Sequence, residues 1–200
     1  MSVPKTLFEL AGATPKPHSL ADAAVIMIDA QNEYVTGGLR LHGIDAALAE
    51  GAKLLAAARE RGRPVIHVQH KGKPGGLFDP ESENFAIADP VAPKGGEAVV
   101  QKTVPNAFAG TDLDARLKGL GVKTLILGGF MTHLCVSATA RSALDHGYAC
   151  TILAPACATR DLPDGQGGAI EAAEIHRVEL AALSDRFAMI ATNLKQITEA

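Results

Sequence analysis

The stretch most suited to chemistry is a cysteine that follows two glycines, in residues 128–136 (GGFMTHLCV). The apolar run 123–127 predicts a buried strand before it, and the alanine-rich run 137–146 predicts a helix after it, ended by Gly147. Cys135 is therefore expected near a helix N-terminus, where the helix dipole and free N–H groups favour negative charge. Such surroundings lower the pKa of a thiol and can hold an oxyanion, so the pattern predicts a nucleophilic cysteine.

Two further reactive side chains are expected at the same edge of the fold as Cys135. Asp29 ends the apolar run 23–28, and Lys102 ends the short run 97–101. If the runs are parallel strands, their carboxyl ends share one edge, where the active crevice of such sheets lies. A cysteine nucleophile needs a proton acceptor, which a carboxylate can supply, and a lysine beside it can tune the pair electrostatically.

The elements that must position these residues alternate between two hydrophobic periodicities. Strands are expected at 23–28, 64–69, 97–101, 123–127, 149–153 and 187–190, and helices at 45–61, 111–120, 137–146 and 168–183. This alternation predicts an α/β fold of three layers, a parallel sheet between helices. Residues 1–21 are expected to lie on the surface or reach a neighbour, and 71–96 and 154–164 are expected to be loops. No repeat or linker interrupts the chain, so we expect a single domain over residues 1–200.

The composition of the chain argues against a nucleic-acid-binding protein and against a membrane protein. The chain has 200 residues, a net charge of −3 and no basic run, so it shows no electrostatic footprint for nucleic acid. No apolar stretch reaches the roughly 20 residues that cross a membrane, and no signal-peptide pattern opens the chain. Three cysteines without metal-ligand spacing predict reduced thiols and a cytoplasmic location.

The quoted motifs together resemble the isochorismatase-like cysteine hydrolases. The carriers of the resemblance are residues 25–34 (VIMIDAQNEY), Lys102 before 106–108 (NAF), the stretch 128–136 and the loop 156–162 (ACATRDL), all in the order of that family. The resemblance implies a six-stranded Rossmann-like sheet, a small-molecule amide-like substrate and a homo-oligomer, either a dimer or a tetramer.

The resemblance also implies roles for individual residues. Asp29, Lys102 and Cys135 correspond to the catalytic triad of the family. A non-proline cis peptide is implied at Phe130–Met131, and it would direct the N–H of Met131, with that of Cys135, at the substrate oxyanion.

Four side chains are candidates for the wall of the substrate pocket: Tyr34, Phe108, Phe130 and His133. His133 lies two residues before Cys135, and residues so spaced do not face each other on a helix, so it is not expected to be the base. Cys150 is expected inside a strand, and Cys157 in a loop with access to solvent.

Departures from the family narrow the expected activity. The nicotinamidase branch carries an Asp-x-His metal signature after its second strand, where this chain has His70-Lys71-Gly72. We therefore expect no metal and no other cofactor. True isochorismatases lack a cysteine at the nucleophile position, so Cys135 favours acyl chemistry on an amide or ureido carbonyl.

Other functions remain open at this point. The chain could be a non-catalytic metabolite-binding member of the fold, an isomerase or lyase that uses the same thiol, or an enzyme with nicotinamidase or isochorismatase activity. Our leading prediction is a hydrolase that cleaves a carbonyl–nitrogen bond through a thioester.

Overall fold

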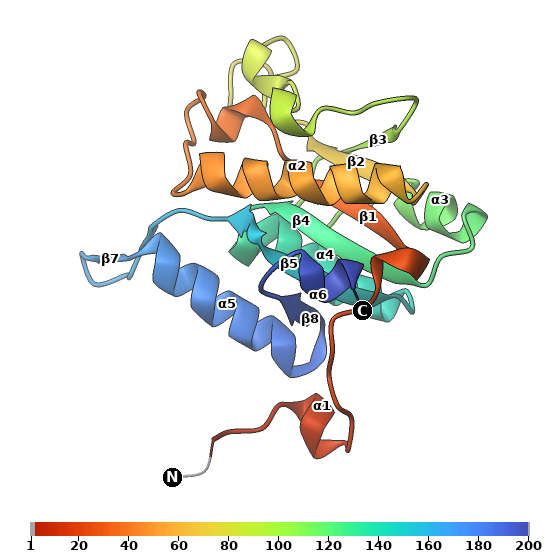
Figure 1. The fold of residues 1–200 in the computed structure, drawn as a ribbon. Helices are drawn as coiled ribbons and strands as arrows, with labels where there is room; N and C mark the ends of the chain where they lie inside the picture. Colours follow the sequence, from red (N-terminus) through yellow and green to blue (C-terminus); the bar gives the residue numbers. More distant parts are fainter. Residues whose placement is uncertain (1–2, 200) are drawn as a thin grey trace.

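A computed structural model describes residues 3–199 as a parallel six-stranded sheet between helices (Figure 1). The strands lie in the order β3-β2-β1-β4-β5-β8. Their bounds are β1 Ala23–Ile28, β2 Val65–His70, β3 Ala98–Lys102, β4 Thr124–Phe130, β5 Ala149–Ala158 and β8 Met189–Ala191. The main helices are α2 Ile44–Glu60, α3 Leu113–Gly119, α4 Ser137–Asp145 and α5 Ala172–Arg186. The expected three-layer α/β fold is confirmed.

Strand β1 shows why the sheet needs helices on both faces. All six of its residues are buried, and they alternate between two cores. Val25 and Met27 pack in the core that α2 covers, whereas Ile26 packs in the core that α3, α4 and α5 cover. A strand buried on both sides is a nearly continuous apolar run, which is the pattern that made β1 recognisable in the sequence.

The strand order reverses beside β1. From β1 the chain moves outward through β2 to β3, and then crosses to β4 on the other side of β1. Such a reversal leaves a crevice beyond the carboxyl ends of the two central strands, since the loops that follow them diverge. Asp29 follows β1 directly, and Met131 follows β4, so both border this crevice.

Gly129 allows β1 and β4 to approach each other closely at the point where the strand order reverses. It pairs with Ile28 in the ladder and has a φ of +119°. A Cβ atom at this position would lie 2.0 Å from the carbonyl oxygen of Ile28. Only glycine fits here, because both the backbone conformation and the space exclude a side chain.

Strand β5 corrects one expectation from the sequence. It continues to Ala158, past Pro155, so the first half of the predicted loop 154–164 is wrong. The ladder with β4 shifts in register, since Leu127 pairs with Ile152 and Gly129 with Cys157. The extra residues of β5 form an irregularity that accommodates the proline, whose missing N–H would otherwise interrupt the ladder.

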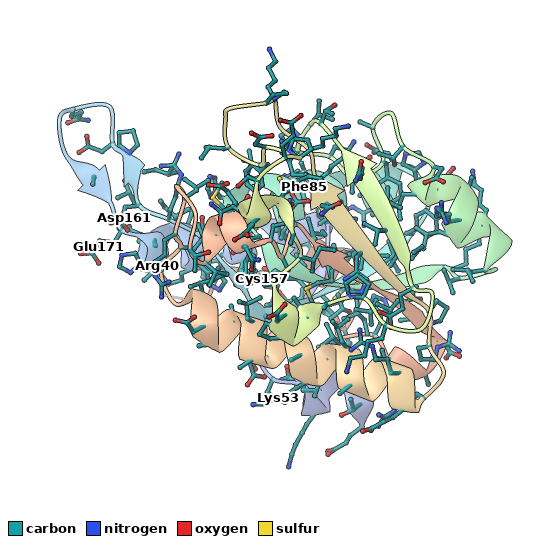
Figure 2. The ribbon with its side chains drawn as sticks, turned by 90° about the horizontal axis from the view of Figure 1, so that it is seen from above. Arg40, Lys53, Phe85, Cys157, Asp161 and Glu171 are labelled. Carbon is teal, nitrogen blue, oxygen red and sulfur yellow. The ribbon has the colours of Figure 1, made fainter. Side chains whose placement is uncertain are left out.

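The shorter elements also differ from expectation. Helix α5 begins at Ala172 rather than at 168, because a hairpin of β6 (Leu162–Pro163) and β7 (Ala169–Ile170) occupies the residues before it. Figure 2 shows this hairpin extending away from the sheet, with Asp161 and Glu171 at its base. The remaining short elements are α1 (Leu7–Leu10), α6 (Lys195–Thr198) and the 3-10 turns Leu20–Asp22, Asn32–Tyr34, Glu83–Phe85 and Asp89–Val91. No helix within residues 3–199 is long and apolar enough to span a membrane.

Candidate active site

Asp29 is fully buried at the carboxyl end of β1. Its φ of +49° lies in the left-handed region, which aspartate tolerates better than most residues. The backbone thus leaves the strand path directly after Ile28. The carboxylate atom Oδ2 lies 2.6 Å from Nζ of Lys102, and Oδ1 has no hydrogen-bond partner among residues 3–199. One carboxylate oxygen is therefore held by a cation and the other is free to accept a proton.

Lys102 reaches the same point from the end of β3, across the end of β2. Its side chain is fully buried, and its ammonium group contacts three acceptors. Besides Asp29, Nζ donates to Sγ of Cys135 at 3.3 Å and lies 3.2 Å from Nδ1 of His70. An ammonium has three N–H donors, so this arrangement can satisfy all of them.

Cys135 lies in a π-helical turn, η5 (Thr132–Val136), that continues directly into α4. The carbonyl of Met131 accepts from the N–H groups of Leu134 at 3.0 Å and Val136 at 3.2 Å, and so passes over that of Cys135. Turns of this kind are rare and occur frequently at functional sites. The widened turn brings Sγ of Cys135 beside the Asp29–Lys102 pair. The residue as a whole is only 3% exposed.

Burial determines the protonation of Asp29 and Cys135 in the protein without substrate. It raises the pKa of Asp29 to about 6, although the charge of Lys102 acts in the opposite direction. Burial, followed by the charge of Asp29, raises the pKa of Cys135 to about 12, again against the effect of Lys102. At neutral pH the pair therefore holds one proton, on the sulfur, beside an ionised carboxylate.

These directions correct the expectation of a thiol with a lowered pKa. The sequence reasoning considered the helix N-terminus and the lysine, which both favour a thiolate. It omitted the loss of solvent and the adjacent carboxylate, and these two effects dominate for Cys135. The site is thus a thiol with a base beside it rather than a preformed thiolate.

The candidate oxyanion donors lie next to the sulfur. The peptide bond between Phe130 and Met131 is cis, as the resemblance implied. Within residues 3–199, the N–H of Met131 donates no hydrogen bond. The N–H of Cys135 does not share the acceptor that its two neighbours in the turn use.

Of the four candidate pocket side chains, the structure places two aromatic rings beside the site. Tyr34 packs edge-to-face on Phe130 and on Phe78, with ring centroids 5.7 Å and 5.1 Å apart. Burial raises the pKa of Tyr34, and the charge of Asp29 adds to this effect. Phe78 belongs to the long loop 71–96, so this loop folds back onto the site.

Phe108 lies elsewhere, and its assignment to the pocket wall is corrected. Its ring stacks on His146 and Tyr148, with centroids 4.7 Å and 5.9 Å apart. These partners follow α4 and precede β5, at the amino ends of the strands. Phe108 therefore belongs to the core at the opposite edge of the sheet.

The segment after β5 contributes polar groups near η5. His133 is partly buried and its Nδ1 is hydrogen-bonded to Thr159 Oγ1. Burial lowers the pKa of His133, and the charge of Arg160 lowers it further. The buried Nε of Arg160 has no hydrogen-bond acceptor among residues 3–199, although another guanidinium nitrogen donates to the carbonyl of Asp161 at 3.1 Å.

His70 is a member of the site that the sequence reasoning missed. It pairs in register with Lys102, so the two side chains leave the sheet on the same face. Its position as the last residue of β2, at the edge that carries Asp29, was the available signal. His67, three residues earlier, is fully buried and binds Glu97 at 2.9 Å instead.

Three side chains of the site carry atoms that could act as metal ligands. Ligand atoms of Asp29, His70 and Cys135 lie within 4.8 Å of one another. However, the ammonium of Lys102 contacts all three groups. A metal ion at their centre would have to displace this ammonium, so the donors present do not suit a resident cation.

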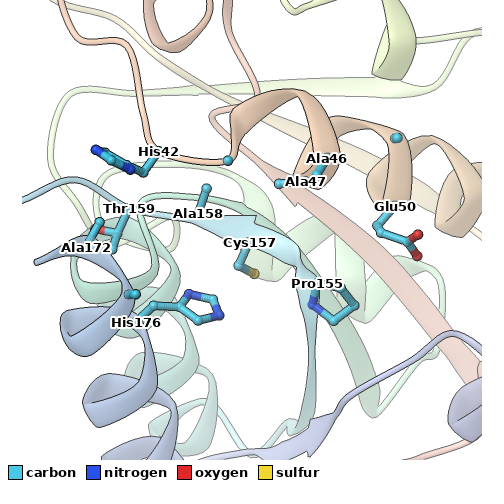
Figure 3. A pocket seen from close by; sticks show the side chains of 13 residues that line it. His42, Ala46, Ala47, Glu50, Pro155, Cys157, Ala158, Thr159, Ala172 and His176 are labelled. Carbon is cyan, nitrogen blue, oxygen red and sulfur yellow. The ribbon is translucent and has the colours of Figure 1, made fainter.

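A cavity of about 610 Å³ lies beside η5, between α2, β5 and α5 (Figure 3). His42, Glu50, Cys157 and His176 line it, but none of Asp29, Lys102 and Cys135 does. Cys157 lies within β5 and is 6% exposed, which corrects the expectation of an accessible loop cysteine.

Comparison with known proteins places the chain among related sequences and structures. Residues 23–193 match the family described as the isochorismatase domain. An isochorismatase crystal structure from Pseudomonas putida is 48% identical, with a TM-score of 0.91 over 94% of this chain and 97% of the other. The uncharacterized isochorismatase family protein YddQ of Bacillus subtilis is 39% identical over 84% of this chain and 95% of its own length. The maleamate amidohydrolase of Pseudomonas putida is 34% identical over 62% of this chain and 67% of its own length.

Proposed function

This chain belongs to the isochorismatase family, and on that premise we propose that it is a cysteine hydrolase that cleaves a carbonyl–nitrogen bond of a small amide or ureido compound. The observation that carries the proposal is the position of the Lys102 ammonium, which contacts both the carboxylate of Asp29 and the sulfur of Cys135. A nucleophile, a base and a cation thus lie in contact with one another in a buried site, where the strand order of the sheet reverses. The name of one relative, maleamate amidohydrolase, agrees with this class of reaction.

In the proposed reaction, Asp29 takes the proton of the Cys135 thiol as the sulfur attacks the substrate carbonyl. A base with a pKa of about 6 suits this role, because it is ionised at neutral pH and still accepts a proton. The N–H groups of Met131 and Cys135 stabilise the tetrahedral oxyanion. Asp29 then protonates the leaving nitrogen, the C–N bond breaks, and a thioester remains on the sulfur.

Water completes the cycle. Asp29, again ionised, accepts a proton from a water molecule that attacks the thioester carbonyl. The thiolate leaves as the acid product forms, and the proton returns to the sulfur. Lys102 carries no proton between reactants in this scheme, since its charge stabilises the carboxylate and the thiolate in turn.

The test is a turnover screen of purified protein against small amides and ureido acids, each with and without a carboxylate. The compounds that carry a carboxylate are included because the buried Nε of Arg160 has no hydrogen-bond acceptor among residues 3–199. Cys135→Ala should abolish turnover, and the matched control Cys157→Ala should retain it, because Cys157 is an equally buried thiol away from the base. Turnover that persists in Cys135→Ala would overturn the proposal.

A further inference from the structure

We propose that His70 is a positioning residue of this site, whose Nδ1 atom accepts a hydrogen bond from Lys102 and thereby holds the ammonium between the base and the nucleophile. This inference rests on the proposed function, because it assigns a role to His70 in the same reaction. No motif that suggested the triad includes His70.

The strand order creates the need for such a residue. Lys102 belongs to β3 and Asp29 follows β1, with β2 between them. The lysine side chain must therefore cross the end of β2 to reach the carboxylate. His70 is the last residue of β2 and lies directly at the crossing, paired in register with Lys102.

The contact geometry fixes the chemical form of the imidazole. Nδ1 of His70 lies 3.2 Å from Nζ of Lys102, which has only protons to offer, so Nδ1 must be unprotonated. The ring is then neutral and carries its proton on Nε2. Burial, and then the charge of Lys102, lower the pKa of His70 to about 4, which agrees with a neutral acceptor at physiological pH.

Two neighbours hold the imidazole in place. The buried side chain of Gln31 clamps the backbone of His70, because its Oε1 accepts from the His70 N–H at 2.8 Å and its Nε2 donates to the His70 carbonyl at 3.0 Å. The ring itself packs edge-to-face on Phe78, with centroids 5.0 Å apart. The backbone and the ring of His70 are thus each held by a contact that does not involve Lys102.

The consequence concerns the ammonium of Lys102. With three acceptors it has one N–H for each of Asp29, Cys135 and His70, and no free donor. Without His70 one N–H is unsatisfied in a buried site, and the group can turn away from the sulfur or the carboxylate. Hydrogen bonds to charged groups of this kind change equilibria by about ten- to a hundred-fold.

The test compares three substitutions of His70 by the rate at which iodoacetamide alkylates Cys135 between pH 4.5 and pH 10. Peptide mapping identifies which cysteine is modified. His70→Asn places an amide oxygen near the former Nδ1 and should stay within about three-fold of wild type. His70→Gln places its oxygen near the former Nε2, and His70→Leu has no acceptor. Both should slow the alkylation of Cys135 at pH 7 at least ten-fold and move the acid limb of its pH–rate profile to higher pH. The control is His146→Leu, which changes a histidine at the far end of α4.

The outcomes separate this inference from the proposed function. If wild-type Cys135 reacts no faster than Cys157, the proposed function falls and the role of His70 falls with it. If wild type reacts selectively but His70→Leu matches it, or His70→Asn is as slow as His70→Gln, only the positioning role is overturned. The comparison of Asn with Gln remains decisive even if His70→Leu fails to fold, because thermal melting of each variant identifies folded protein.

Discussion

Replacing Lys102 by methionine tests how the site controls its protons. Nζ of Lys102 lies 2.6 Å from Oδ2 of Asp29 in a fully buried pair. At an effective dielectric constant of about 20, this distance corresponds to an attraction of about 6 kcal/mol, and about 1.4 kcal/mol equals one pKa unit. Without the lysine the carboxyl group should therefore hold its proton up to a pH about four units higher than in wild type.

The effect on reactivity follows from the number of protons in the pair. In wild type the acid limb of Cys135 alkylation should lie near pH 6, the value to which burial raises the pKa of Asp29. Below that pH the base is protonated and reactivity falls; above it the base is ionised and can take the thiol proton. In Lys102→Met both Asp29 and Cys135 are protonated at pH 7, so the alkylation rate there should fall about a thousand-fold.

The assay is the rate of iodoacetamide modification of Cys135 against pH, with Lys71→Met as the control, because Lys71 is an exposed lysine just beyond β2. The variant should fold, since Asp29 can avoid an unpaired buried charge by staying protonated. We expect the acid limb to move upward by at least two pH units. An acid limb that stays within half a unit of wild type, in a variant with a native melting transition, would refute the reasoning.

Three further predictions concern other parts of the molecule. Gly129→Ala should lower the free energy of unfolding by roughly 3 kcal/mol in urea denaturation, because its Cβ would meet the carbonyl oxygen of Ile28, whereas Gly147→Ala, which has open space, should cost about 1 kcal/mol. Turnover should survive dialysis against EDTA, because the ammonium of Lys102 occupies the position that a cation would need; loss on chelation with recovery on added zinc would contradict this. Sedimentation should show a dimer or tetramer, as the resemblance to the family implies, and a species of only about 20 kDa would exclude it.

The sequence was sufficient to predict the alternating strands and helices along the chain and the common edge of Asp29, Lys102 and Cys135. Asp29 and Lys102 each end an apolar run, and Cys135 follows a strand and a glycine turn, so their common edge followed from parallel topology alone. The same reasoning did not reach His70. Its contact with Lys102 depends on β2 lying between β3 and β1, and strand order is not readable from the periodicity of each strand.

Other misses share one physical cause, which is burial by residues distant in sequence. The sequence pattern predicted a strand at 149–153 and a loop after it, but an irregular register with β4 carries β5 past Pro155 and encloses Cys157. Phe108 follows Lys102 closely in sequence, but its stacking partners lie at the other edge of the sheet. The protonation of Cys135 likewise depends on lost solvent, which a local pattern does not report.

The most direct test of the account is to trap the covalent intermediate. A substrate found in the amide and ureido screen would be mixed with enzyme, quenched with acid within milliseconds to seconds, and analysed by intact mass and peptide mapping. We predict an acyl group, the substrate minus its leaving amine, on the peptide that contains Cys135, and its absence in Cys135→Ala. An acyl group on another residue, or full turnover by Cys135→Ala, would contradict the assignment of Cys135 as the nucleophile.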